Sequence, residues 1–259
     1  MIAVRDIAFT TVAIGKDVAL QSRFLKNSAE VMGIDLLVCD EGSELKYNHA
    51  IHKVECYRRW LKKLPPAVSH IVFVDAFDSF FAQPADWFAA RLAETDQALI
   101  VGAERENWPE RNPHWANCFP KTPSGRNFIN TGFFMGQREA LDEALALLDL
   151  ARTKLENDFP AENIDDVYWL RNLALGSEQL LWQIARYKRW FEMSLDDTCQ
   201  YVANVTTDDH SVKGNAFYRV DRNQIVVRES GLQPGVVHFP GPGIDSMPAW
   251  FEIFFGNAP

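Results

Sequence analysis

Two aspartates at the end of an apolar run are the residues of this sequence whose types and spacing could do chemistry. The run from His70 to Val74 is apolar or nearly so, and Asp75 and Asp78 come next. Two carboxylates this close repel each other unless a positive charge lies between them. A divalent cation would supply that charge, because hard cations prefer oxygen ligands. A helix cap plus a surface acid is the alternative that this pair alone leaves open.

A histidine near the C-terminus could complete such a site. His238 ends a second apolar segment, and Gly241 and Gly243 follow it in the run "FPGPG". Glycines let backbone N–H groups approach an anion closely, and together with a bound metal they suggest a diphosphate. Two carboxylates and an imidazole form a mixed oxygen and nitrogen ligand set that suits Mn²⁺, with Mg²⁺ as the other candidate. A packing or loop role for His238 is the alternative.

The elements that must position these residues alternate between strand and helix in the first half of the chain. One helix is expected to bury Leu20, Phe24 and Val31 on one face and to end at Gly33. Such alternation implies an α/β fold with a mainly parallel sheet and helices on both faces, and ligands bind at the carboxyl edge of such sheets. The strands are expected at 7–15, 34–39, 70–75 and 97–103, and the helices at 16–33 and 49–66.

The second half is less regular, and no repeat or low-complexity linker separates it from the first. We expect a single domain, 1–259, with a nucleotide-binding half of about 1–110 and an acceptor- and metal-completing half of about 111–259. The expected elements are strands at 127–136 and 235–238, helices at 138–158 and 177–190 (the second capped by Ser177), and a small hairpin at 217–228.

The composition narrows the class of protein. Of the 259 residues, 47% are hydrophobic, which is enough for a sizeable core, and the net charge of −9 argues against a nucleic-acid binder. No segment approaches the ~18 uninterrupted apolar residues of a membrane helix. The N-terminal run contains Arg5 and Asp6 and is interpreted as a strand rather than a signal peptide. The scattered cysteines form no CxxC pair, so we expect a cytoplasmic protein without a disulfide framework.

Seven segments of the sequence occur in the order in which one enzyme family has them: "VFVDAFDSFF", "AERENWPE", "FINTGFFMG", "SEQLLWQIARY", "SLDDTCQYV", "VVHFPGPG" and "FFGNAP". On these segments, and along nearly its whole length, the sequence resembles the glycosyltransferase domain of procollagen lysyl hydroxylases and glycosyltransferases. The resemblance implies a GT-A fold, a UDP-sugar donor and Mn²⁺, and it matches Asp75, Asp78 and His238 to the metal ligands of the family.

The resemblance also implies contacts with the donor. Thr11, Val12 and Ala13 would hold the uridine through backbone and side chain, and Lys53 would contact a phosphate or the uridine. Phe77 stands where the family usually has tyrosine. It could stack on uracil, but it offers no hydroxyl for a hydrogen bond.

Other matched residues would lie near the transferred sugar. Trp108 could form an apolar platform or simply pack, and Asn130 could bind sugar hydroxyls or belong to an ordinary core strand. Glu178 and Gln179 match an Asp-Gln step at the start of a helix. Glu178 is the leading candidate for a base or a sugar-positioning group, with helix-dipole stabilisation as its structural alternative. Asp165–Asp166 compete for the same role, or begin a solvated helix.

One departure from the family follows His238. The family typically reads Gly-Asn-Gly-Pro and then lysine, whereas this chain keeps Gly241 and Gly243 and has no lysine there. The absence of this lysine would weaken diphosphate binding, or it would leave Lys53 and the metal to neutralise the charge of the diphosphate. We expect a metal-dependent transferase that moves a hexose from a UDP-sugar to a hydroxyl of a glycan, glycolipid or protein. The alternative is a catalytically weak UDP- or carbohydrate-binding protein that keeps the fold.

Overall fold

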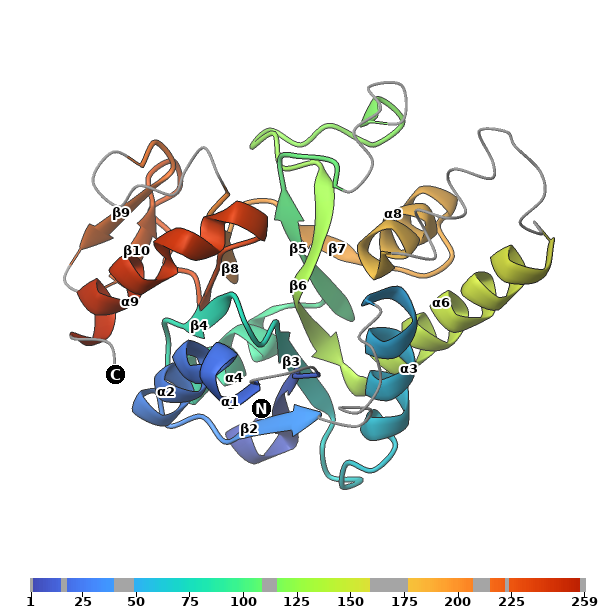
Figure 1. Ribbon diagram of the computed structural model, residues 1–259, viewed down its shortest axis with the longest axis horizontal. Coiled ribbons are helices and arrows are strands. Elements are labelled where there is room, and N and C mark those ends of the chain that lie inside the picture. Colours follow the sequence, from blue (N-terminus) through green and yellow to red (C-terminus); the bar gives the residue numbers. More distant parts are fainter. Residues whose placement is uncertain are drawn as a thin grey trace.

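The computed structural model describes residues 2–14, 18–39, 49–108, 116–158, 177–206, 215–221 and 224–256. Figure 1 shows a central sheet between helices, with a smaller group of strands beside it. Within the described residues the central sheet has six strands, in the order β2-β1-β3-β6-β5-β7. Their bounds are β1 (Ile7–Val12), β2 (Leu36–Cys39), β3 (His70–Val74), β5 (Leu99–Glu104), β6 (Phe128–Gln137) and β7 (Ser194–Asp196).

The sheet is mainly parallel, as predicted. Strand β6 runs antiparallel to β3 and β5, and the other described pairings are parallel. The carboxyl ends of β1, β3 and β5 therefore meet the N-terminal part of β6 at one edge of the sheet. This edge is where ligands bind in open α/β sheets.

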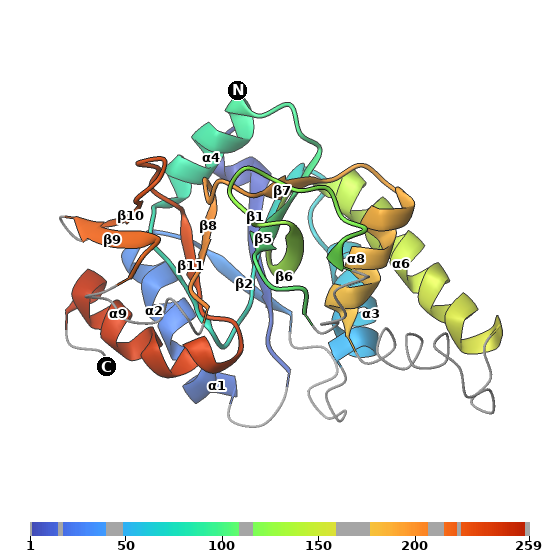
Figure 2. The same ribbon diagram turned by 90° about the horizontal axis from the view of Figure 1, so that it is seen from above.

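Side chains of the central strands alternate between two cores, as the two-residue period of a strand requires. In β3, Ile71 and Phe73 enter one core, and Val72 and Val74 enter the other. Helices α3, α6 and α8 cover the first core and lie together on one side in Figure 2, whereas α2 and α4 cover the second. The helices are α1 (Val18–Gln21), α2 (Arg23–Val31), α3 (His49–Leu61), α4 (Ala85–Glu94), α6 (Arg138–Asp158) and α8 (Glu178–Lys188).

A smaller sheet, in the order β4-β11-β8, contributes side chains to a third core. Phe80 of β4 and Val237 of β11 pack in this core with Trp250 and Phe251 of the C-terminal helix α9. The predicted hairpin is confirmed as the antiparallel pair β9 and β10. The elements are β4 (Ser79–Phe81), β8 (Val202–Asn204), β9 (Tyr218–Asp221), β10 (Gln224–Val227), β11 (Val236–His238) and α9 (Met247–Phe255), with the 3₁₀ helices η1 (Val4–Asp6) and η3 (Gly241–Ser246).

One predicted helix face is wrong. Gly33 ends the helical segment with φ +65°, as expected, and Phe24 is buried, but Leu20 and Val31 are 62% and 67% exposed. The helix is interrupted at Ser22, so α1 and α2 do not share one continuous apolar stripe. The buried positions of α2 are Phe24, Leu25, Ser28 and Ala29. In the part of the chain that the structure describes, no helix has the length and apolar character needed to cross a membrane.

Candidate metal centre

Asp75 and Asp78 lie where the chain passes from the central sheet into the smaller one. Asp75 follows the last residue of β3, and its N–H donates to the carbonyl of Gly132 in β6 at 2.8 Å. Asp78 immediately precedes β4 in the smaller sheet. Their side chains are partly exposed, 29% for Asp75 and 22% for Asp78. The D-x-x-D spacing thus places two accessible carboxylates at the junction of the sheets.

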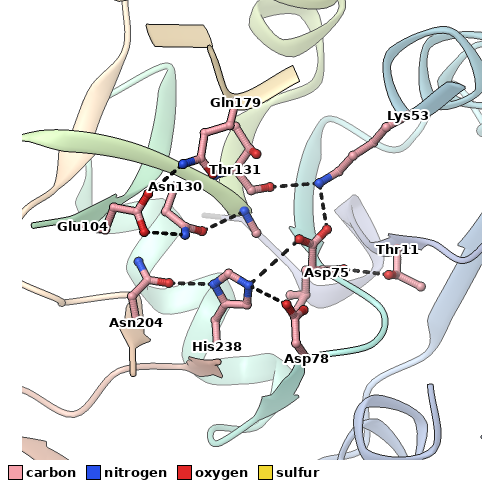
Figure 3. Close-up of polar contacts among 12 residues, drawn as sticks. Thr11, Lys53, Asp75, Asp78, Glu104, Asn130, Thr131, Gln179, Asn204 and His238 are labelled. Atoms are coloured by element: carbon pink, nitrogen blue, oxygen red, sulfur yellow. Dashed lines mark hydrogen bonds and ion pairs between the residues drawn. The ribbon is translucent and has the colours of Figure 1, made fainter. Parts of the chain in front are cut away.

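His238 reaches the same junction from β11. In the small sheet it pairs in register with Ser79 of β4, and the N–H of Phe239 donates to the carbonyl of Asp78 at 2.7 Å. Its Nε2 lies 3.4 Å from Oδ2 of Asp78 and 3.9 Å from Oδ2 of Asp75 (Figure 3). One ligand atom from each of the three residues lies within 4.8 Å of the others.

The chemistry of this donor set fits a divalent cation. Burial alone would lower the pKa of His238, but the negative charges of Asp78, Asp75 and Glu104 outweigh it and raise that pKa. Its Nε2 is buried and makes no hydrogen bond with the residues that the structure describes. Two carboxylates around such a nitrogen make a negatively charged oxygen and nitrogen set that suits Mn²⁺. The identity of the ion stays a prediction.

The imidazole of His238 packs directly against the backbone of strand β6 at Gly132. The pairing of β5 with β6 shifts register between Val101 and Gly102, so residues 131–133 of β6 are passed over. Gly132 lies in this stretch, and a Cβ added to it would fall 2.2 Å from Cε1 of His238. That distance is far inside van der Waals contact, so the ring can occupy its position because residue 132 has no side chain.

Gly132→Ala is therefore expected to lower Mn²⁺ affinity roughly tenfold to a hundredfold, the range seen when support for a metal ligand is lost. The added methyl group must push the ring of His238 away from Asp75 and Asp78. Overpacking of this kind also costs about 1–3 kcal/mol of stability. Calorimetric titration with Mn²⁺ and a melting curve would measure both effects.

The control is Gly125→Ala, because Gly125 has φ +75° and open space around it. That change imposes a backbone cost of roughly 1–2 kcal/mol without touching His238. It should lower the melting temperature and leave Mn²⁺ affinity unchanged. Equal Mn²⁺ affinity in both variants and the parent would show that the ring does not depend on the glycine.

Lys53 of α3 approaches Asp75 from the side opposite His238. Its Nζ donates to Oδ1 of Asp75 at 2.7 Å, to Oε1 of Glu178 at 2.9 Å and to the carbonyl of Thr131 at 3.4 Å. Glu178 is the first residue of α8, whose N-cap Ser177 forms the predicted side-chain hydrogen bond. The carboxylate of Glu178 also accepts a bond from the Thr131 hydroxyl at 3.2 Å. Lys53 thus joins two helices across the site, and its predicted contact with the donor stays a prediction.

Glu104, which was not among the predicted site residues, is the centre of a buried network beside the metal ligands. Nδ2 of Asn130 donates to its Oε2 at 3.1 Å, and Nε2 of Gln179 donates to its Oε1 at 2.6 Å and to the carbonyl of Trp108 at 3.1 Å. Burial raises the pKa of Glu104 to about 7, against these hydrogen bonds and the charge of His238, which favour the anion. Its place at the end of a strand is the same signal that identifies Asp75.

In this network Asn130 and Gln179 act as hydrogen-bond donors to Glu104. Both amides are buried and hold the carboxylate of Glu104, and Oδ1 of Asn130 accepts a bond from the N–H of Gly132 at 2.9 Å. Direct contact of either amide with a sugar stays a prediction.

The residues expected around the uridine lie at the end of β1 and in the turn after β3. The hydroxyl of Thr11 is buried and donates to the carbonyl of Val74 at 2.6 Å, and Val12 and Ala13 are buried as well. Their side chains are therefore internal, so the predicted contact with the uridine, which stays a prediction, would have to come from backbone groups. Phe77 is partly exposed beside the aspartates, as a stacking role requires.

The remaining predicted residues differ in exposure. Trp108 is 49% exposed, which suits a platform for a ligand. Gly241 is exposed with φ +59°, whereas Gly243 is buried, and a Cβ on it would lie 2.5 Å from the carbonyl oxygen of Val205. Gly243 is thus needed for packing, and its approach to a diphosphate stays a prediction. Asp165–Asp166 lie outside the described residues.

Comparisons with known proteins show which family the sequence matches. The family model of the PLOD GT domain matches residues 4–242. The human multifunctional procollagen lysine hydroxylase and glycosyltransferase LH3 is 23% identical over 193 residues, which are 71% of this chain and 23% of that protein. A multifunctional procollagen lysine hydroxylase and glycosyltransferase of Caenorhabditis elegans is 30% identical over 98 residues, 37% of this chain and 13% of the relative. This chain therefore spans less than a quarter of the length of these curated relatives.

Among solved structures, a glycosyltransferase involved in the glycosylation of the major capsid of PBCV-1 has a similar fold. The TM-score is 0.50 at 13% sequence identity, and the match covers 95% of this chain and 98% of the other. At this identity the likeness concerns the fold, which is the GT-A-like α/β arrangement that the sequence predicts.

Proposed function

This chain belongs to the PLOD GT domain family, and we propose that it is a metal-dependent glycosyltransferase that moves a hexose from a UDP-sugar to a hydroxyl acceptor. Family membership supports the glycosyltransferase class, and the donor, the metal and the hexose are the finer parts of the proposal. The observation that supports the metal is the convergence of Asp75, Asp78 and His238 at the carboxyl edge of the sheet, whereas the UDP-sugar donor and the hexose rest on the family resemblance. The acceptor class that we propose is a hydroxyl of a glycan, glycolipid or protein.

Asp75, Asp78 and His238 would hold Mn²⁺, which when bound would neutralise the charge of a departing UDP. Lys53 adds a second positive charge next to Asp75, and its ion pairs with Asp75 and Glu178 orient it. Backbone groups at the end of β1 and the partly exposed ring of Phe77 would bind the uridine. In this arrangement the diphosphate end of the donor would lie near the metal, with the sugar towards Glu104.

The contacts of Glu178 favour a positioning role over that of a base. Its carboxylate is buried, ion-paired with Lys53 and bonded to the hydroxyl of Thr131. Its Oε1 already accepts bonds from Lys53 and Thr131, so this oxygen is engaged by the protein itself rather than by an acceptor hydroxyl. We therefore propose that Glu178 acts mainly through Lys53.

A second candidate function is binding of UDP or a carbohydrate without transfer. The sequence after His238 lacks the lysine typical of the family, and Lys53 is already engaged with two carboxylates. Both features would weaken the hold on a diphosphate leaving group.

Incubating the chain with a panel of UDP-hexoses, with Mn²⁺ and with a chelator, would separate the two functions. A transferase should release UDP from at least one donor when Mn²⁺ is present, faster when hydroxyl acceptors are added, and should stop when the metal is chelated. A binding protein would show a Mn²⁺-dependent thermal shift with UDP and no release. Failure of every UDP-sugar to bind in the presence of Mn²⁺ would contradict the transferase and the binding of UDP, and would leave carbohydrate binding as the remaining function.

A further inference from the structure

Asn204 in β8 connects the candidate metal ligand His238 to the central sheet. Its Oδ1 lies 2.7 Å from Nδ1 of His238, and its Nδ2 donates to the carbonyl of Ala103 in β5 at 2.8 Å. Asn204 is 4% exposed, so water does not compete for these bonds. Figure 3 shows the amide on one side of the ring and the two aspartates on the other.

The carbonyl of Ala103 determines which way this amide points. A carbonyl oxygen can only accept hydrogen bonds, so the NH₂ group of Asn204 must face Ala103 and the amide oxygen must face His238. An amide oxygen is also only an acceptor, so Nδ1 of His238 must carry the proton in the 2.7 Å contact. In the neutral ring, Nε2 then keeps its lone pair, and Nε2 is the atom that faces Asp75 and Asp78.

The backbone around Asn204 holds this arrangement in place. Strands β8 and β11 are parallel neighbours with Asn204 and His238 in register, so both side chains leave the small sheet at the same level. On the ring itself, the close approach of Gly132 leaves little room for rotation. The orientation of the imidazole is therefore set jointly by residues of both sheets.

We propose that Asn204 is a positioning residue that fixes His238 as the Nδ1–H tautomer and thereby presents the Nε2 lone pair to a divalent cation. The metal part rests on the proposed function, but the tautomer belongs to the metal-free chain and can be measured without any ion. Hydrogen-bond partners of this kind are known to set the ring orientation and the basicity of metal-binding histidines.

Nitrogen-15 NMR of the metal-free protein, at a pH well above the pKa of the imidazole, would test the tautomer. The signal of His238 is assigned by its loss in His238→Gln. We expect the parent to show a protonated Nδ1 and an unprotonated Nε2. Asn204→Leu removes the acceptor with a similar side-chain size, so it should give a mixture of tautomers. Asn204→Asp loses the NH₂ donor to the Ala103 carbonyl, which should lower stability, but it keeps the acceptor that faces Nδ1 and should retain the Nδ1–H form.

Calorimetric titration with Mn²⁺ supplies the second readout. Asn204→Leu should bind Mn²⁺ roughly tenfold to a hundredfold more weakly than the parent, and Asn204→Asp should recover most of the loss. The control is Tyr218→Phe, which removes a buried hydroxyl bonded to the backbone of Asn204 and leaves its side chain intact. This control should lose stability but keep the tautomer and the affinity of the parent.

The outcomes separate this inference from the proposed function. A parent protein with the Nε2–H tautomer overturns the inference even if Asn204→Leu fails to fold. An Asn204→Leu protein with the tautomer and Mn²⁺ affinity of the parent also overturns it. A parent that does not bind Mn²⁺ contradicts both the metal site and the presentation of Nε2 to it, and the NMR spectra then decide whether Asn204 still fixes the tautomer.

Discussion

Asp78→Ala should abolish Mn²⁺-dependent binding of UDP and leave the fold intact. The side chain of Asp78 is partly exposed and faces Nε2 of His238, so it contributes to the site rather than to a core. The N–H of Phe239 donates to the backbone carbonyl of Asp78, and the substitution keeps this hydrogen bond because it changes only the side chain. Losing one of two carboxylate ligands removes much of the negative charge that would hold a divalent cation.

The measurement is calorimetric titration of UDP with Mn²⁺ and with a chelator, accompanied by a melting curve. Asp86→Ala is the matched control, because Asp86 is an exposed acid in the first turn of α4 and its loss changes the net charge equally. It should lose about 0.3–1 kcal/mol of helix stability and keep UDP binding. Unchanged Mn²⁺ dependence in Asp78→Ala would show that the metal ligands are wrongly assigned.

The parts of the fold that the sequence predicted are those with long, regular patterns. Strand β3 and helix α6 have enough residues for the period of their apolar positions to be seen, and both lie where expected. Strands β4 and β8 have three residues each, too few to show a period, and they form because β11 lies between them. Helix α9 was not predicted, because Ile253 and Phe255 on its less buried side are apolar too and weaken the amphipathic signal.

The candidate site was predictable where each residue follows an apolar strand. Asp75, Asp78 and His238 met that condition, and the structure brings them together. Their supporting contacts depend on which strands and helices become neighbours. Asn204 and His238 are 34 residues apart in the chain, and Lys53 and Glu178 are 125 apart. Local patterns do not contain such pairings, so these contacts emerged only from the three-dimensional arrangement.

The ion pair between Lys53 and Glu178 should give unequal losses of stability when its members are replaced singly. Lys53→Met leaves the carboxylate of Glu178, which is 9% exposed, with the hydroxyl of Thr131 as its remaining described partner. Leaving a buried charge without its partner typically costs about 3–5 kcal/mol. Glu178→Gln should cost less, because Lys53 keeps Asp75 at 2.7 Å.

The double variant, Lys53→Met with Glu178→Gln, should be more stable than the sum of the two single losses predicts. It removes both charges, so neither is buried alone, and contacting pairs of this kind show interaction energies of about 0.5–3 kcal/mol. Urea unfolding of the four proteins measures this interaction energy. Lys62→Met is the control, because Lys62 is exposed and its replacement changes the net charge equally. It should change stability by less than about 0.5 kcal/mol.

UDP affinity and turnover of the same variants distinguish the two roles of Glu178. If Lys53 binds the donor, Lys53→Met should weaken UDP binding roughly tenfold to a hundredfold, which corresponds to one charge-assisted hydrogen bond of about 1.5–3 kcal/mol. If Glu178 acts by orienting Lys53, Glu178→Gln should weaken UDP binding in the same direction, to a smaller extent, and adding it to Lys53→Met should weaken binding no further. A base would behave differently, because Glu178→Gln would then bind UDP like the parent and lose turnover. An active Glu178→Gln enzyme with normal UDP affinity would exclude both roles and leave Glu178 a purely structural partner of Lys53.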